Sequence, residues 1–297
     1  MSAEDKGKPR GTIAHLVAAE GLDDSEAINF SPSRSAGGSG DSGSTSSVAK
    51  RVPVQGRLRA ADMLIPGSQL GPGFSDEYRR IKRPLLANAF GKTASLVERG
   101  NLILVTSSVP GEGKTHIAVN LALSIAQERD HTVLLVDCDI NKQGGSRMLG
   151  VDNRPGLVDV LENDNITVGD ARLSTDVPEL TVLSAGKQHE YMTELLASQR
   201  RARLVDEIAS RYDDRVIIFD GPPLLPTPQT QVLATLVGQI VFVIEAGKTS
   251  QAVVEEAAEM IPDDKAIGLV MNKSEGLSSH SGSYYGYYGS GGDDNKE

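Results

Sequence analysis

The chain is poor in three features, and each shortage narrows the class of protein. Its single cysteine, Cys138, excludes an intramolecular disulfide and fits a reducing compartment. No apolar run approaches the roughly 18 residues that a membrane-spanning helix needs, and the polar stretch from Met1 to Arg10 lacks the apolar core of a signal peptide. Basic residues are outnumbered, with 30 Lys and Arg against 40 Asp and Glu, which argues against a general nucleic-acid-binding protein. We therefore expect a cytoplasmic protein that binds no nucleic acid and reaches a membrane only through a partner.

What the chain does contain is a glycine-rich stretch at Ser108–Thr115, with the sequence Ser-Val-Pro-Gly-Glu-Gly-Lys-Thr. An apolar run at Leu102–Val105 precedes it, and a helical pattern at Lys114–Gln127 follows it. A glycine-rich turn between a strand and a helix is the setting of a phosphate-binding P-loop. The stretch departs from the usual pattern at its first position, where Ser108 replaces glycine. The sequence thus predicts a site for a nucleoside triphosphate.

The residue types of this stretch suit a triphosphate together with a metal ion. Gly111 and Gly113 let the backbone turn its N–H groups toward an anion, and the helix N-terminus adds favourable partial charge. Lys114 can reach the β- and γ-phosphates, and Thr115 can ligate Mg²⁺. The expected nucleotide-binding residues of this stretch are Pro110, Gly111, Glu112, Gly113, Lys114, Thr115 and His116.

The region 75–275 alternates between strand and helix patterns. The strand candidates are Leu102–Thr106, Thr132–Asp137, Leu180–Leu183, Arg215–Asp220, Gln239–Glu245 and Ala266–Asn272. Most are continuous apolar runs, which is typical of strands buried on both faces of a parallel sheet. The helix candidates between them are Lys114–Gln127, Gly156–Leu161, Met192–Ser198, Ala202–Ser210, Thr230–Val237 and Gln251–Ile261. The pattern predicts an α/β domain with a doubly wound, mostly parallel sheet flanked by helices.

The regions on either side of this domain differ in composition. Residues 1–74 are predicted to be largely disordered, since Ser and Gly dominate Ser31–Ser47. Within them Thr12–Glu20 could form a short amphipathic helix, for which a docking peptide and a transient helix are equally good interpretations. Residues 276–297 form a second flexible, Ser- and Gly-rich segment. This tail holds a tyrosine cluster at Tyr284, Tyr285, Tyr287 and Tyr288.

Two predicted strands deliver carboxylates to the edge of the sheet where the P-loop lies. Asp137 follows the apolar run Val133–Val136, with Asp139 two residues further on, and Asp220 follows the run Val216–Phe219. In an open parallel sheet the carboxyl ends of the strands line the ligand crevice. Carboxylates beside a phosphate site suit Mg²⁺ binding and proton abstraction, although one of the first pair could instead cap a helix or a turn. Asp220 fits the Mg²⁺-organising aspartate of a Walker B strand.

A charged helical face precedes the P-loop. Glu77, Arg80 and Arg83 fall at i, i+3 and i+6, which places them on one side of a helix. Taken alone, such a face is more often a solvated surface than an interface. Pro84 follows directly and predicts a kink or a fresh helix start.

Together these motifs resemble those of the bacterial protein-tyrosine kinases of exopolysaccharide biosynthesis, which belong to the deviant-Walker P-loop superfamily. The likeness covers about residues 75–290. It rests on the P-loop, the aspartate-bearing strands, the Asp-x-Pro-Pro motif at Asp220–Pro223, the Glu-x-x-Arg-x-x-Arg helix and the tyrosine cluster. The stretch Ile81–Ala89 is similar to the exosortase-associated subgroup of tyrosine autokinases. One departure is Asn141, at a position where the family usually carries arginine.

The resemblance implies an enzyme that transfers phosphate from ATP to protein tyrosine, with ATP and Mg²⁺ as cofactors. It implies catalytic roles for Lys114, Asp137, Asp139 and Asp220, metal ligation by Thr115, Asp139 and Asp220, and a nucleotide contact at Asn272. It implies autophosphorylation of Tyr284, Tyr285, Tyr287 and Tyr288, in trans within a ring-like homo-oligomer built by Glu77, Arg80 and Arg83. The implied partners are a tyrosine phosphatase and a separate membrane activator or chain-length-determinant protein, which would bring the chain to the inner membrane face.

Two other functions fit parts of the pattern. A partition- or cell-division-like ATPase switch would organise a membrane partner without phosphorylating tyrosine, and a non-catalytic scaffold would use the tail for recruitment alone. Partition-type ATPases carry an extra lysine early in the P-loop, where this chain has Val109. That difference favours the kinase.

Overall fold

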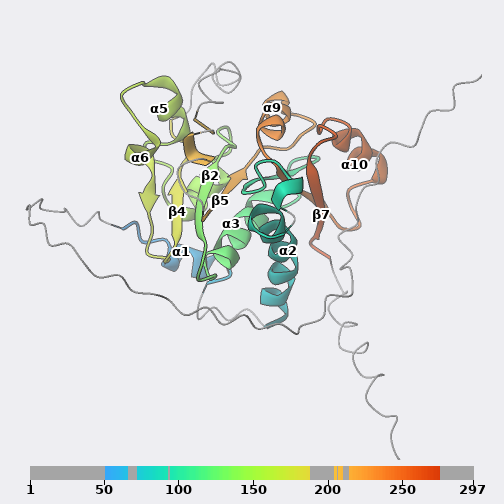
Figure 1. The fold of residues 1–297 in the computed structure, drawn as a ribbon, viewed down its shortest axis with the longest axis horizontal. Coiled ribbons are helices and arrows are strands. Elements are labelled where there is room, and N and C mark those ends of the chain that lie inside the picture. The colour runs from blue at the N-terminus through green and yellow to red at the C-terminus, as the bar shows by residue number, and fades with distance from the viewer. Residues whose placement is uncertain are drawn as a thin grey trace, which may run out of the picture.

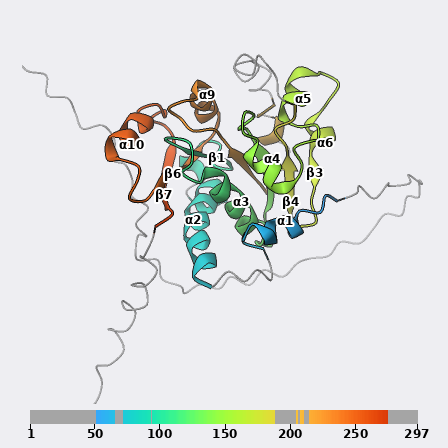
Figure 2. The ribbon, with the colours of Figure 1, turned by 180° about the vertical axis from the view of Figure 1, so that it is seen from behind.

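The computed structural model describes residues 51–65, 72–92, 94–187, 204–205, 207–209 and 214–274. These residues form one sheet with the strand order β3-β4-β2-β5-β1-β6-β7. The strands are β1 (Leu102–Ser107), β2 (Thr132–Asp137), β3 (Leu173–Ser174), β4 (Leu180–Leu183), β5 (Arg215–Asp220), β6 (Gln239–Glu245) and β7 (Ala266–Asn272). Strand β3 is antiparallel to β4, and all other neighbours are parallel. The predicted fold class is therefore confirmed. Figures 1 and 2 show β7 and the β3–β4 pair at opposite ends of the sheet.

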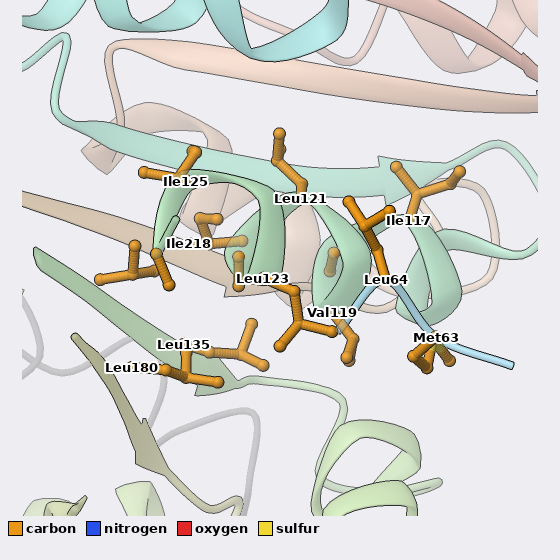
Figure 3. Close-up of a cluster of buried hydrophobic side chains, with 14 of the residues drawn as sticks. Met63, Leu64, Ile117, Val119, Leu121, Leu123, Ile125, Leu135, Leu180 and Ile218 are labelled. Carbon is orange, nitrogen blue, oxygen red and sulfur yellow. The ribbon is translucent and has the colours of Figure 1, made fainter. Parts of the chain in front are cut away.

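Alternate residues of the central strand β1 enter different hydrophobic cores. Ile103 and Val105 belong to the core on one face of the sheet, and Leu102 and Leu104 belong to the core on the other. All four side chains are fully buried, which explains why the strand is a continuous apolar run and not an alternating one. Figure 3 shows part of the first core, where α3 packs on the sheet.

Helices cover both faces of the sheet. The first core receives side chains from α1 (Gln55–Ala60), α2 (Pro72–Phe90), α3 (Lys114–Ile125) and α4 (Gly144–Leu149). The second receives them from α5 (Leu157–Glu162), α6 (Val168–Ala171), α9 (Pro228–Leu236) and α10 (Gln251–Ala258). A short 3₁₀ helix, η1 (Ala94–Leu96), connects α2 to β1. The result is the three-layer arrangement expected of a doubly wound domain.

All six predicted strands are present. Five have the predicted bounds, and β1 extends one residue further, to Ser107. The patterns did not predict β3, α4 or α6, which have two to six residues each and are too short to show a period. The predicted helix Met192–Ser198 lies outside the described residues, and so do residues 202, 203, 206 and 210 of the predicted helix Ala202–Ser210.

Residues 52–65 differ from the expectation that the region before residue 75 is largely disordered. Their side chains enter the first core, with Val54, Leu58, Met63, Leu64 and Ile65 buried. The backbone N–H of Leu64 donates to Asn120 Oδ1 of α3 at 2.7 Å, and α1 lies beside α4 (Figure 2). Isolated apolar residues spaced over a short segment give no clear periodic signal, so only the packing identifies them. The domain therefore includes these residues, and residues 1–50 lie outside the described part of the chain.

Helix α2 has one buried side and one charged side. Tyr78, Lys82 and Leu85 are buried, whereas Glu77, Arg80 and Arg83, at positions i, i+3 and i+6, are all exposed. The helix continues through Pro84, so the predicted fresh start is wrong. Within the described ranges, no helix combines the length and the apolar character that crossing a membrane requires.

Candidate active site

The P-loop follows β1 and ends where α3 begins at Lys114. Gly113 is the N-cap of α3, with a φ of +98°, and Gly111 has a φ of +100°. A Cβ on Gly113 would overlap Asn272 Nδ2 of β7, so the Asn272 side chain would have to leave its hydrogen bond to the backbone oxygen of Glu112. Gly113 is therefore required both by the left-handed backbone and by the close approach of the last strand.

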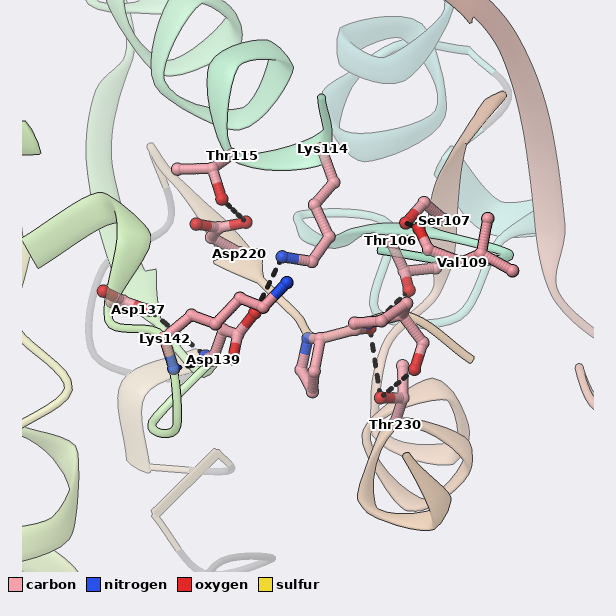
Figure 4. Close-up of polar contacts among 12 residues, drawn as sticks. Thr106, Ser107, Val109, Lys114, Thr115, Asp137, Asp139, Lys142, Asp220 and Thr230 are labelled. Carbon is pink, nitrogen blue, oxygen red and sulfur yellow. Dashed lines mark hydrogen bonds and ion pairs between the residues drawn. The ribbon is translucent and has the colours of Figure 1, made fainter. Parts of the chain in front are cut away.

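The P-loop lysine points at the second aspartate of the β2 motif. Lys114 Nζ donates to Asp139 Oδ2 at 2.8 Å, and both side chains are almost completely shielded from solvent (Figure 4). This pairing joins two residues that were predicted to share one site. The carboxylate of Asp139 also balances the positive charge of Lys114, as a bound phosphate would.

The first aspartate of that motif holds the start of α4. Asp137 Oδ2 accepts hydrogen bonds from the backbone N–H and the hydroxyl of Ser146, both at 2.7 Å, and Oδ1 accepts from the N–H of Asp139 at 3.1 Å. Burial raises the pKa of Asp137, and the bonds from Ser146 oppose that rise. Of the two interpretations left open for this pair of carboxylates, capping describes the contacts that Asp137 makes here.

Asp220, at the end of β5, is the third carboxyl group of the site. Thr115 Oγ1 donates to Asp220 Oδ1 at 3.2 Å, while Oδ2 is buried with no hydrogen-bond partner among the described residues. Burial raises the pKa of Asp220 to about 8, and the nearby charge of Asp137 adds to the rise. A buried carboxylate oxygen without a donor, beside a threonine hydroxyl, fits a divalent cation.

The first residues of α4 close over these carboxylates. A Cβ on Gly145 would lie 3.4 Å from both Asp137 Oδ2 and Asp220 Oδ2, and one on Gly144 would lie 3.1 Å from Thr115 Oγ1.

No group of three or more His, Cys, Asp or Glu side chains in the described part of the chain is arranged to hold a metal alone. Mg²⁺ commonly binds through one or two carboxylates plus substrate phosphates and water, so this donor set suits it.

Glu112 faces inward and ties the P-loop to its surroundings. Its Oε2 accepts from the N–H of Val109 at 2.8 Å, and its Oε1 accepts from the hydroxyl of Thr249. Asn272 Nδ2 donates to the backbone oxygen of Glu112 at 2.8 Å, so the amide that was expected to contact the nucleotide contacts the P-loop here. These contacts set the shape of the loop.

The remaining predicted residues fall in three places. Pro110 is exposed at the top of the P-loop, and His116 is half-buried in the first turn of α3, where burial lowers its pKa. The charged face of α2 lies outside the carboxylate cluster. The tyrosine cluster lies outside the described residues.

Ser146, Thr249 and Lys273 act as partners that the sequence patterns did not predict. Thr249 and Lys273 contact P-loop residues 137 and 162 positions away, whereas Ser146 lies 9 positions after Asp137. The nearest signal in the sequence was the position of Lys273 directly after Asn272 at the end of the last predicted strand.

Known proteins are similar to this chain in both sequence and fold. A model of the AAA domain family matches residues 100–262, more than half of the 297 residues. The tyrosine-protein kinase YwqD of Bacillus subtilis is 33% identical over 217 residues, which cover 72% of this chain and 86% of that protein. The chain belongs to the family of bacterial tyrosine-protein kinases.

Two further proteins are similar to this chain, one in sequence and one in structure. The succinoglycan biosynthesis transport protein ExoP of Rhizobium meliloti is 31% identical over 59% of this chain and 22% of its own length. The crystal structure of the VpsO kinase domain matches with a TM-score of 0.56 and 28% identity, covering 68% of this chain and 98% of that domain. The residues matched by the AAA domain model, 100–262, contain the P-loop, all three aspartates and strands β1 to β6.

Proposed function

We propose that the protein is an ATP-dependent tyrosine autokinase that phosphorylates its own C-terminal tyrosine cluster and thereby regulates exopolysaccharide polymerisation or export. The observation that carries the proposal is the meeting of Lys114 with Asp139 and of Thr115 with Asp220 at the start of α3. Membership of the tyrosine-protein kinase family supports the reaction type. The likeness to a succinoglycan transport protein supports the link to polysaccharide.

The proposed roles follow from the contacts. Thr115 and Asp220, together with Asp139, would hold Mg²⁺, which supplies charge neutralisation for the triphosphate of bound ATP. Lys114 exchanges its bond to Asp139 for the phosphates, since both are anionic partners at the same end of the loop. Asp137, held by Ser146, receives the proton of the tyrosine hydroxyl as that oxygen forms its bond to the γ-phosphorus and ADP leaves. Catalysis of this kind is mainly positioning and electrostatics.

The substrate tyrosines are close in sequence to the site. Asn272 of β7 lies at the P-loop, and Tyr284 follows it by 12 residues. A Gly- and Ser-rich coil of that length spans roughly 20 Å, enough to reach its own site or that of a neighbour. The exposed face formed by Glu77, Arg80 and Arg83 would build the homo-oligomer in which transfer occurs in trans.

The proposed kinase works with two partners, a membrane protein and a tyrosine phosphatase. A membrane activator or chain-length determinant would bring the protein to the inner membrane face. A tyrosine phosphatase would remove the phosphates from the tail. Each added phosphate brings about −1.5 to −2 charge, so phosphorylated tails would repel one another and loosen the oligomer.

The test is to incubate the purified full chain with ATP and Mg²⁺, with and without the cytoplasmic segment of a candidate activator, and to map phosphosites by mass spectrometry. Phosphotyrosine is expected within the cluster of Tyr284, Tyr285, Tyr287 and Tyr288. It is lost in Lys114→Met but kept in the control Lys92→Met, in the exposed turn that follows α2. ATP hydrolysis without phosphotyrosine would support the ATPase switch instead. Neither activity, with the activator present, would support the scaffold.

A further inference from the structure

The residues at the end of β7 hold the P-loop from the side opposite to the carboxylates. Lys273 Nζ donates to the backbone oxygen of Gly111 at 2.6 Å, and Asn272 Nδ2 donates to that of Glu112 at 2.8 Å. Lys273 is also one of the few non-glycine residues with positive φ, at +58°. Its backbone is thus in the left-handed region, which few side chains occupy without a compensating contact.

A second set of contacts fixes the lysine itself. Glu245 Oε2, at the end of β6, accepts from Lys273 Nζ at 3.3 Å. The hydroxyl of Thr249 accepts from the N–H of Glu245 and donates to the carboxylate of Glu112. The ends of β6 and β7 therefore contact both the backbone and the side chain of the P-loop.

The planar peptide converts these carbonyl contacts into an orientation of N–H groups. In a trans peptide the oxygen of one residue and the N–H of the next point in opposite directions. When Lys273 holds the oxygen of Gly111, the N–H of Glu112 must face the other way. When Asn272 holds the oxygen of Glu112, the N–H of Gly113 must do the same.

This orientation is one that the loop would not keep alone. Gly111 and Gly113 have no side chain to restrict their dihedral angles, so the free loop samples many conformations. A loop whose carbonyl oxygens turned toward a phosphate would repel it. We infer that Lys273 is a positioning residue that presets the P-loop for phosphate by anchoring the oxygen of Gly111. This inference rests on the proposed function only for the choice of ATP as the ligand.

The chain offers a matched control for this lysine. Lys248 Nζ lies 3.3 Å from the same Glu245 Oε2, and it makes no contact with the P-loop among the described residues. Both lysines are at least partly exposed and each is one charge. Replacing either removes the same charge from Glu245, but only the replacement of Lys273 releases Gly111.

The experiment measures the affinity of the full chain for ATP and for ADP, each with Mg²⁺, by isothermal titration calorimetry. Lys273→Met should raise the Kd for both nucleotides about tenfold, the effect of one charge-assisted hydrogen bond, and Lys273→Arg should restore part of it. Lys248→Met should leave both within about twofold of the original chain. In autophosphorylation, Lys273→Met should raise KM for ATP and leave kcat at saturating ATP nearly unchanged.

Three outcomes would overturn the inference. One is unchanged nucleotide affinity in Lys273→Met, and a second is equal loss in Lys248→Met. The third is a fall in the nucleotide-free Tm of Lys273→Met with loss of kcat, which would mean a merely structural role. Failure of the proposed function is distinguishable, because a chain that binds ATP without forming phosphotyrosine would still show the Lys273 effect on Kd.

Discussion

The two sides of the P-loop differ in whether the protein itself supplies partners for their polar groups. On the carboxylate side, Asp137 and Asp220 are buried and one oxygen of Asp220 has no partner in the described part of the chain. On the β7 side, the oxygens of Gly111 and Glu112 are both held by side chains of the protein. The first side leaves charge to be balanced by a ligand, and the second side fixes shape. Changes on the first should therefore stop turnover, whereas changes on the second should weaken nucleotide binding.

The largest effect is expected for Asp220→Asn, on the carboxylate side. The amide keeps the size of the side chain and can still contact Thr115, but it removes the charge that would hold Mg²⁺. Autophosphorylation should fall on the order of 10²–10³-fold. The Tm of the nucleotide-free protein should stay level or rise, because the variant removes a buried ionisable group whose Oδ2 has no partner among the described residues. A large loss of Tm would show that Asp220 stabilises the fold, and it would contradict the difference drawn between the two sides of the P-loop.

The next effect is expected for Gly113→Ala, at the contact with β7. Left-handed backbone costs a non-glycine residue about 1–2 kcal/mol, and the new Cβ would meet Asn272 Nδ2 at 2.0 Å. Urea unfolding should show a loss of at least that size. Gly111→Ala is the matched variant, since its φ is also positive but nothing lies within 4 Å of its Cβ. Equal losses of unfolding free energy in the two variants would mean that the close approach of Asn272 adds nothing to the destabilisation.

A smaller effect is expected for Glu112→Gln. The amide nitrogen cannot accept a hydrogen bond, so either the contact with the N–H of Val109 or that with Thr249 is lost. One such bond contributes about 1 kcal/mol, which predicts a severalfold rise in KM for ATP with kcat retained. Thr249→Val removes the second contact, together with the bond from the N–H of Glu245 to Thr249, but keeps the contact with Val109. It should give a smaller rise in KM, measured in the same assay. A fall in kcat alone would place Glu112 in the chemistry instead.

The smallest effect on the site is expected from the exposed face of α2. Arg80→Ala with Arg83→Ala should reduce the oligomer seen by native mass spectrometry and leave ATP affinity within about twofold. Arg79→Ala is the control, because Arg79 lies on the same helix and is paired with Asp76 at the exposed surface. An unchanged oligomer in the double variant, or equal dissociation in the control, would contradict the interface role.

The sequence was sufficient for the strands and for the motif residues of the site. Strands such as β5 and β6 are buried on both faces, so their apolar runs carry the signal directly. Lys114, Asp139 and Asp220 come together because parallel strands end at one edge of the sheet. This much follows from local pattern and topology.

The partners of those residues could not be predicted in the same way. The cap that Asp137 provides for α4 by accepting from Ser146, and the hydrogen bond from Lys273 to Gly111, depend on how short or distant segments pack. The segment at residues 52–65 was missed for a related reason, since its buried residues follow no single period. The packing of short or distant segments therefore decides which contacts each motif residue makes.

The most direct test of the two-sided P-loop compares Asp220→Asn and Lys273→Met in one pair of assays, ATP binding by calorimetry and phosphotyrosine by mass spectrometry. The account predicts that Asp220→Asn retains measurable nucleotide binding but forms almost no phosphotyrosine at any ATP concentration. It predicts that Lys273→Met binds ATP about tenfold more weakly yet reaches nearly full phosphorylation when ATP is saturating. The same pattern of loss in both variants would contradict it.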